Sequence, residues 1–160
     1  MKTPLGREHL QSFIDTHRLN ATILPMAVPT ATVTDAAGAL GVEPSAIIKS
    51  LVFLAGDRPF LVVNSGTARV NRKKLADYLS MNRRRVKFAT AEQALEITGY
   101  VVGSMPPFGH RKPLRTIVDR AAVQREEMYG GGGDIDALVR VSSMELMGVT
   151  QAEIAEVSEM

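Results

Sequence analysis

Two apolar segments separated by a tight turn constrain the fold of this chain most. Ile47–Leu54 and Phe60–Asn64 are rich in β-branched and aromatic residues, and Gly56–Pro59 lies between them as a cluster of turn residues. A connection this short cannot form the crossover that two parallel neighbouring strands require. The pair therefore predicts an antiparallel hairpin and argues against a doubly wound parallel sheet.

Helix signals are interspersed with strand signals along the rest of the chain. Residues 6–18 carry apolar side chains at helical spacing, and Asn71 is placed to cap a helix that runs through Leu79. Thr90 with Gln93 forms a capping-box pattern ahead of a helix that ends at Gly99. Further caps are expected at Thr34, at Ser142 with Glu145 and at Thr150 with Glu153, and further strands at Leu114–Asp119 and Asp136–Val141. This order predicts an α+β fold in which a mixed sheet packs against helices.

The chain has the length and composition of one domain without cysteine chemistry. Its 160 residues contain no repeat, low-complexity block or linker, so we expect a single domain over residues 1–160. The absence of cysteine excludes disulfides, thiolate metal sites and a thiol nucleophile, and it favours a cytoplasmic location. The longest strongly apolar run, residues 51–55, is far too short to span a bilayer, so no membrane partner is expected.

Positive charge is concentrated in one stretch, although the net charge is only +2. Residues 69–87 contain Asp77 as their single acid and eight bases, namely Arg69, Arg72, Lys73, Lys74, Arg83, Arg84, Arg85 and Lys87. Such a stretch can contact a phosphate backbone. It is equally typical of a solvated helix face followed by a turn.

The common catalytic motifs are missing from the sequence. It contains no G-x-S-x-G elbow, Walker A sequence or H-E-x-x-H motif. The histidines, His9, His17 and His110, include no pair at metal-ligand spacing. We therefore expect no metal and no cofactor.

Lys49 is the first candidate functional residue. Strand alternation places its ammonium on one face with the large apolar side chains of Ile47, Leu51 and Phe53. A cation in such surroundings is costly unless it has a partner or faces a wet cleft. Lys49 is thus either an edge residue whose ammonium reaches solvent or a cation that orients a carbonyl, carboxylate or phosphate in a pocket.

Two glycine-containing segments are the other candidates. Residues 99–110 combine three glycines with Pro106-Pro107, which suits a rigid loop whose backbone amides approach a ligand or a developing oxyanion. Gly130–Gly133 precedes an expected strand and could be a flexible hairpin or the wall of a cleft. Both segments could also be ordinary turns, and a lone His110 is more typical of a structural than of a catalytic histidine.

In this order, the segments carry a family resemblance over about residues 20–148. The matching parts are T-x-x-D-A-A-x-A-L-G from Thr32 to Gly41, Ile48–Phe53, Thr98–Tyr100, G-x-x-x-P from Gly103 to Pro107 with Phe108-Gly109, and the glycine run before Asp134. The set resembles the YbaK-type aminoacyl-tRNA deacylases and is similar to the editing domain inserted in bacterial prolyl-tRNA synthetases. The sequence departs from the cysteinyl-tRNA deacylases of this family, because Met128-Tyr129 and four glycines replace a Ser-Ala-Gly-Lys-Arg-Gly-like segment.

The resemblance implies a fold, a reaction and a set of site residues. The implied fold is a mixed, barrel-like sheet surrounded by helices, and the implied reaction is hydrolysis of a wrong aminoacyl ester, such as Ala or Cys on tRNA-Pro, without a cofactor or protein nucleophile. Lys49 falls on the essential lysine of the family. Substrate binding is expected at Thr32, Ser50, Gly103, Ser104, Met105, Pro106, Pro107, Gly109, His110, Gly131, Gly132 and Gly133. The tRNA backbone is expected at Arg72, Lys73, Lys74, Arg83, Arg84 and Arg85, with a synthetase as a further candidate partner.

Two other functions fit the sequence. A non-catalytic module of the same fold could recognise a nucleotide, an aminoacyl group or a synthetase, and it would tolerate loss of Lys49. A hydrolase of other small esters would leave the basic stretch without a role.

Overall fold

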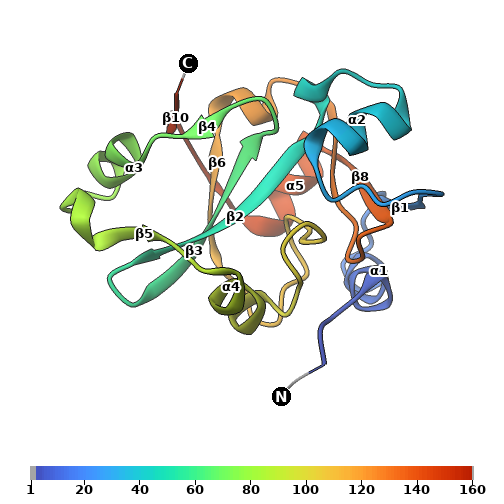
Figure 1. The fold of residues 1–160 in the computed structure, drawn as a ribbon, viewed down its shortest axis with the longest axis horizontal. Helices are drawn as coiled ribbons and strands as arrows, with labels where there is room; N and C mark the ends of the chain where they lie inside the picture. Colours follow the sequence, from blue (N-terminus) through green and yellow to red (C-terminus); the bar gives the residue numbers. More distant parts are fainter. Residues whose placement is uncertain (1–2, 160) are drawn as a thin grey trace.

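A five-stranded mixed sheet lies at the centre of the molecule (Figure 1). The computed structural model describes residues 3–159. The strand order is β5-β2-β3-β6-β9, with β2 antiparallel to β3 and β5, and with β3, β6 and β9 parallel to one another. The strands are β2 (Ile48–Ala55), β3 (Arg58–Ser65), β5 (Val86–Phe88), β6 (Arg115–Asp119) and β9 (Glu153–Ala155).

The expected antiparallel hairpin is confirmed, with a tighter turn than the sequence indicated. β2 and β3 pair from Ile48 opposite Ser65 to Ala55 opposite Arg58, so that only Gly56 and Asp57 form the turn. Gly56 has a φ of 65°, in the left-handed region that favours glycine in two-residue hairpin turns. Eight consecutive residue pairs thus fix the register that positions Lys49.

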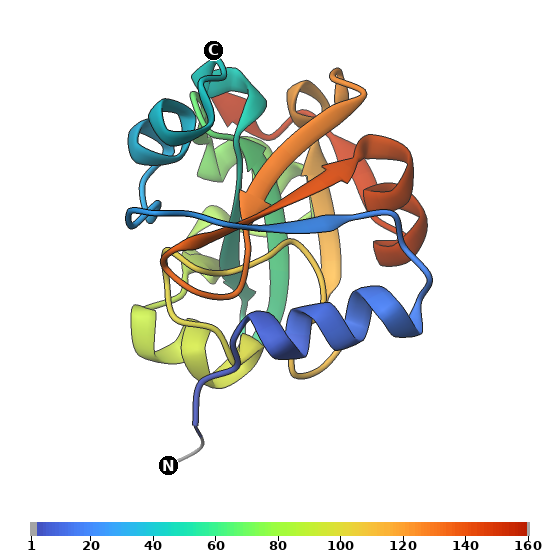
Figure 2. The same cartoon turned by 90° about the vertical axis from the view of Figure 1, so that its right-hand side faces the viewer.

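The strands form three sheets and do not close into the expected barrel. The second sheet is antiparallel in the order β1-β8-β7, made of β1 (Thr22–Pro25), β7 (Glu127–Gly131) and β8 (Ala137–Ser142). The third pairs β4 (Arg69–Val70) with β10 (Ser158–Glu159). The second sheet crosses in front of the five-stranded one in Figure 2. The two are joined by the single bridge between Ile47 and Tyr129, so no continuous ladder closes the barrel.

Five helices in the described part of the chain surround the sheets, which confirms the expected α+β class. They are α1 (Arg7–Thr16), α2 (Val33–Leu40), α3 (Arg72–Tyr78), α4 (Ala91–Thr98) and α5 (Ser143–Thr150). Short 3₁₀ turns are η1 (Pro44–Ala46), η2 (Arg83–Arg85) and η3 (Arg120–Val123). Within residues 3–159, no helix is long and apolar enough to cross a bilayer.

Three of the five expected helix caps are confirmed, and two are wrong. Asn71, the Thr90 capping box and Ser142 each begin a helix. α2 is capped by Thr32 and not by Thr34, because the Thr32 hydroxyl accepts the Asp35 amide at 3.0 Å. Thr150 ends α5 instead of starting a helix, since the chain turns at Gln151 and continues into β9.

The alternation of β2 divides its side chains between two cores. Ile48 and Val52 pack into the larger core between the two main sheets. Leu51 and Phe53 face the second core, which includes Leu75 of α3. Lys49 shares the face of Leu51 and Phe53, as expected from strand periodicity.

An ion pair joins β9, at the edge of the five-stranded sheet, to its neighbour β6. Arg115 of β6 donates two hydrogen bonds to Glu153 of β9, at 2.8 and 2.9 Å, and the Tyr78 hydroxyl donates a third at 2.8 Å. Chiefly through the hydrogen bond from Arg115, this arrangement lowers the pKa of Glu153 to about 2. Because the carboxyl binds protons more weakly in the folded state, its contribution to stability is present above about pH 4.5 and is lost as the pH falls towards 2.

Replacing Glu153 should therefore destabilise the protein in a pH-dependent manner. Glu153→Gln should lower the free energy of unfolding by about 0.5 kcal/mol at pH 7, a value set by the solvent exposure of the pair. The difference from wild type should shrink as the pH falls from 4.5 to 2.5, as measured by urea unfolding. Glu156→Gln is the control, because its 3.4 Å pair with Arg120 is largely exposed. If Glu153→Gln were less stable than wild type by the same free energy at pH 4.5 and at pH 2.5, the lowered pKa of Glu153 would not contribute to stability.

Candidate functional site

A cavity of about 300 Å³ lies beside the start of β2. Its walls come from segments that are distant in sequence: residues 30–33 with Ala36, residues 47–51, Val102 with Gly103 and Met105, and Gly130 with Gly131, together with Leu138. Most of the lining is apolar, with hydroxyls from threonine and serine and the ammonium of Lys49 as polar groups. We call this space the Lys49 cavity.

Among the described residues, Lys49 brings the only charged side chain to the lining of this cavity. It is partly buried, and it forms no ion pair with any residue between 3 and 159. Burial lowers the pKa of the ammonium below 10.5, and the nearby charge of Arg69 lowers it further. An incompletely solvated cation without a protein partner is suited to bind a carbonyl, carboxylate or phosphate of a ligand.

Gly103 and Met105 belong to one wall of the Lys49 cavity, and their backbone amides are its candidate hydrogen-bond donors. Gly103 has a φ of 95°, and a side chain there would lie 3.1 Å from the Ala31 methyl group, so glycine is required. Ser104 is held in place by hydrogen bonds from its amide and its hydroxyl to the Val101 carbonyl, at 3.0 and 2.7 Å. Neither the Gly103 nor the Met105 amide donates a hydrogen bond to another described residue. These two amides are available to an oxygen atom of a ligand.

The glycine run packs tightly instead of forming the flexible hairpin that its composition suggested. Gly130 and Gly131 belong to β7, and a Cβ atom on Gly131 would overlap the Met105 carbonyl. A Cβ atom on Gly132 would lie 2.6 Å from the backbone of Ala137. The Gly133 amide donates to the Ser104 carbonyl at 2.8 Å. The run is therefore a rigid wall that supports the amide-bearing loop.

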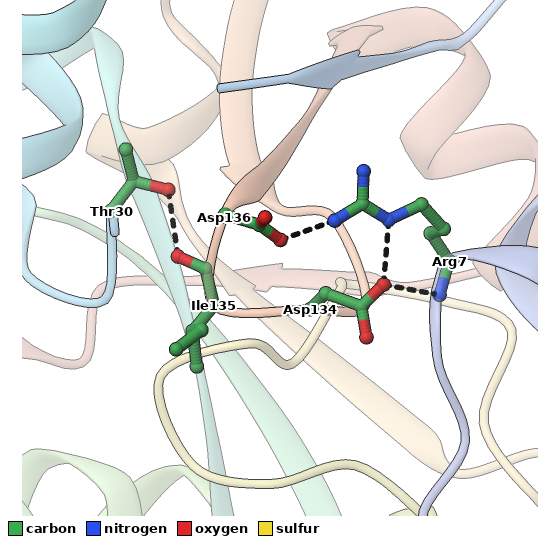
Figure 3. Close-up of polar contacts among 5 residues, drawn as sticks. All are labelled: Arg7, Thr30, Asp134, Ile135 and Asp136. Atoms are coloured by element: carbon green, nitrogen blue, oxygen red, sulfur yellow. Dashed lines mark hydrogen bonds and ion pairs between the residues drawn. The ribbon is translucent and has the colours of Figure 1, made fainter. Parts of the chain in front are cut away.

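Polar contacts from the N-terminal helix fix the end of this wall (Figure 3). Arg7 binds Asp134 through its Nε atom at 2.6 Å and also contacts the Asp136 carboxylate. The hydrogen bond that Arg7 donates to the Asp134 carboxylate is the main reason that the pKa of Arg7 is raised. Thr30 donates its amide and its hydroxyl to the Ile135 carbonyl, at 2.7 and 3.3 Å. The turn after the glycines is thus tied to α1 and to the segment that enters α2.

The structure brings five of the twelve expected substrate-binding residues together with Lys49. Those that line the cavity are Thr32, Ser50, Gly103, Met105 and Gly131. They come from four segments, and the hairpin register and the glycine packing described above set their positions.

The other expected substrate-binding residues lie outside the cavity lining. Ser104 and Gly133 face a separate hollow near Asp134, and Gly132 donates its amide to Ala137. Pro107, Gly109 and His110 line a third, smaller hollow beside α1, and buried Pro106 contributes its carbonyl to the contact with His110.

His110 has a structural contact in this position. Its Nε2 atom donates to the Pro106 carbonyl at 2.8 Å. Burial lowers the pKa of His110 to about 4, against the opposing effect of that hydrogen bond, so the ring is neutral at pH 7. The neutral His110 ring thus links the end of this turn to its first residue, Pro106, through one hydrogen bond.

The expected tRNA-backbone residues form an exposed basic surface away from the cavity lining. Arg72, Lys73 and Lys74 lie on α3, and Arg83, Arg84 and Arg85 form η2. All six are exposed, and Lys74 donates its ammonium to the Ser158 carbonyl at 2.9 Å. In Figure 1 this basic surface lies at the left, whereas α2, which borders the cavity, lies at the upper right.

Several apolar residues of the cavity lining were not predicted from the sequence. Ala31, Val33, Val102 and Leu138 all face the cavity. Val102 precedes Gly103, an expected substrate-binding residue, so its place in the sequence could have indicated that it lines the cavity. The sequence held no such indication for Leu138, because an apolar residue of an alternating strand looks the same whether it faces a core or a cavity.

The chemistry of the lining favours binding and polarisation over covalent catalysis. No His, Cys, Asp or Glu lines the cavity, so its hydroxyls have no adjacent base. No group of three such residues able to hold a metal occurs in the part of the chain that the structure describes. What remains is a cation, two unpaired amides and an apolar wall around a small volume.

Known proteins resemble this chain in sequence and in structure. The profile of the aminoacyl-tRNA editing domain family matches residues 27–149. A proline–tRNA ligase of Limosilactobacillus fermentum is 35% identical over 120 residues, which are 71% of this chain and 21% of the ligase. The chain spans about a fifth or less of the length of the ligases it matches.

Two solved structures share the fold over nearly the whole chain. The hypothetical protein APE2540 has a TM-score of 0.88 at 36% identity, covering 94% of this chain and 99% of that one. A protein described as a candidate trans-editing enzyme for prolyl-tRNA synthetase has a TM-score of 0.86 at 30% identity, covering 96% and 97%.

The close packing of the glycine wall gives a direct test. Gly131→Ala should lower the free energy of unfolding by about 1–3 kcal/mol, because the new methyl group must displace the Met105 carbonyl. Gly148→Ala, in α5 with nothing within 4 Å of the new methyl group, should instead raise it by about 0.5–1 kcal/mol. Urea unfolding measures both values. Equal stability of Gly131→Ala and wild type would show that the wall is not tightly packed.

Proposed function

Because the chain belongs to the aminoacyl-tRNA editing domain family, we propose that it hydrolyses the ester of mischarged aminoacyl-tRNA. The observation that carries this proposal is the Lys49 cavity, a small apolar space lined by Lys49, which forms no ion pair with any described residue, and by Gly103 and Met105, whose amides donate no hydrogen bond to another described residue. The substrate we propose is tRNA-Pro carrying a small wrong amino acid such as alanine or cysteine. The similarity to proline–tRNA ligases supports this choice of tRNA.

The size and lining of the cavity favour a small aminoacyl group. A volume of about 300 Å³ is at the lower end of ligand pockets. Ala31, Val33 and Val102 present an apolar surface to a short side chain. A pocket of this kind excludes larger side chains well but separates similar small ones by only about 1–3 kcal/mol.

The amides and Lys49 would act on the ester carbonyl. We infer that the carbonyl oxygen accepts from Gly103 and Met105 and that these bonds strengthen as negative charge develops. Lys49 adds positive charge beside the carbonyl and also orients the terminal ribose or its phosphate. The Ser50 and Thr32 hydroxyls are further donors within the lining.

The reaction needs no protein nucleophile. A water oxygen bonds to the carbonyl carbon, and the bond from that carbon to the ribose oxygen breaks. The ribose oxygen takes up the proton that the attacking water loses, so the products are the free amino acid and the uncharged tRNA. An aminoacyl ester is already reactive, and holding it beside water and fixed charges is enough to accelerate this step.

The basic surface on α3 and η2 is the proposed contact for the body of the tRNA. We infer that Arg72, Lys73 and Lys74 on α3, with Arg83, Arg84 and Arg85 in η2, contact the phosphate backbone of the tRNA. We further infer that the protein acts in trans on tRNA charged by a synthetase. The likeness to the candidate trans-editing enzyme supports this inference.

Release of amino acid from mischarged tRNA tests the central claim. Wild type should release alanine or cysteine from tRNA-Pro, and Lys49→Ala should reduce kcat/KM by about 100-fold because the carbonyl loses its neighbouring charge. Lys112→Ala, an exposed lysine outside the cavity lining, should keep wild-type activity. If wild type releases nothing, the protein is a binding module and not a deacylase. If Lys49→Ala is as active as wild type, the protein is a deacylase but Lys49 has no part in the reaction.

Charge reversal tests the basic surface separately. The double variant Arg83→Glu, Arg84→Glu should raise the KM for charged tRNA about 10-fold at low salt and weaken the dependence of KM on salt, because fewer counterions are released. Lys112→Glu is the matched reversal outside this surface. A KM that responds neither to salt nor to the double reversal would exclude a backbone contact here.

A further inference from the structure

An exposed aromatic ring lies at the edge of the basic surface. Phe88 ends β5, the edge strand of the five-stranded sheet, and it is 58% exposed. Edge strands usually carry charged side chains that discourage contact with other chains. A large apolar ring in this position therefore calls for a function.

Phe88 is the outermost of three aligned rings. Its ring centroid lies 5.0 Å from that of Phe53, and the Phe53 centroid lies 5.9 Å from that of Phe60. The planes within each pair differ by less than 30°. Phe53 and Phe60 are buried, so Phe88 rests on a rigid support and presents its surface to solvent at low entropic cost.

The chain immediately before Phe88 is strongly basic. Arg83, Arg84, Arg85 and Lys87 are exposed, and within residues 3–159 none of them forms an ion pair. An aromatic platform beside unpaired cations is the combination that binds single-stranded nucleic acid, since bases stack on the ring and phosphates meet the charges. A protein partner would have to bring a strongly acidic surface to the same place.

Phe88 also stands in line with the Lys49 cavity. Lys49, Leu51 and Phe53 point to one face of β2, and Phe88 lies directly opposite Phe53. Four residues along a strand cover about 13 Å. Stacked nucleotides advance about 3.4 Å each, so this length matches a few nucleotides of a stacked single strand.

We propose that Phe88 is a stacking site for an unpaired base of the tRNA 3′ end while the terminal ester occupies the Lys49 cavity. This inference rests on the proposed function, and it adds a contact to a base to the contacts with phosphates. Ring stacking is tolerant of base identity, so Phe88 positions the strand and does not select its sequence.

A fluorescent RNA tests the contact directly. The probe is an acceptor-stem hairpin with four unpaired 3′ nucleotides, in which 2-aminopurine replaces one unpaired base at a time. Wild type and Phe88→Tyr should quench the fluorescence at one position. Phe88→Leu, which still covers Phe53 but cannot stack on a base, should abolish the quenching and weaken binding about 10-fold. Met144→Ala removes an apolar side chain that is 84% exposed on α5, and it should bind like wild type.

Deacylation assays on the same variants separate the two proposals. If Phe88→Leu raises KM for mischarged tRNA about 10-fold without changing kcat, the stacking site and the proposed function both stand. If wild type is active and Phe88→Leu quenches and binds like wild type, the stacking site is overturned and the ring becomes a contact for a protein. If quenching depends on Phe88 but wild type releases no amino acid, the proposed function fails and the stacking site remains.

Discussion

Direct contact between two stretches of backbone holds the candidate site together. Gly131 lies so close to the Met105 carbonyl that no side chain fits between them, and Gly133 adds a hydrogen bond to the Ser104 carbonyl. This contact turns the loop into a fixed wall, and the Gly103 and Met105 amides of that loop donate no hydrogen bond to another described residue. Arg7 then anchors the wall through Asp134 and Asp136, so α1 supports a site that it does not line.

A cation without a counter-ion gives the cavity its chemical character. Lys49 sits among apolar groups and near Arg69, and both lower its pKa. Such placement costs stability in the free protein, because a partly buried charge lacks the solvation it has in water. Functional sites commonly retain an arrangement of this kind, since the same unsatisfied charge becomes favourable when an electron-rich ligand enters.

The candidate reaction site and the cluster of basic side chains lie in different parts of the molecule. The cavity lining carries one cation, whereas seven of the other eighteen Lys and Arg side chains lie on α3, η2 and β5. A ligand with a small reactive end and a long anionic body matches this division. Aminoacyl-tRNA has these two parts, and the division explains why a net charge of only +2 is compatible with binding it.

The sequence alone determined the elements that depend on local chemistry. The β2–β3 hairpin, the helix starts at Asn71, Thr90 and Ser142, and the face of Lys49 follow from turn residues, caps and strand alternation, and the ordered motifs led to the correct family. Only the tertiary structure decided how the glycine run packs, which residues of the Gly103–His110 loop face the cavity, and that the sheets stay open. Those outcomes depend on contacts between residues far apart in the chain, such as Gly131 with Met105 and Ile47 with Tyr129, and no local pattern encodes them.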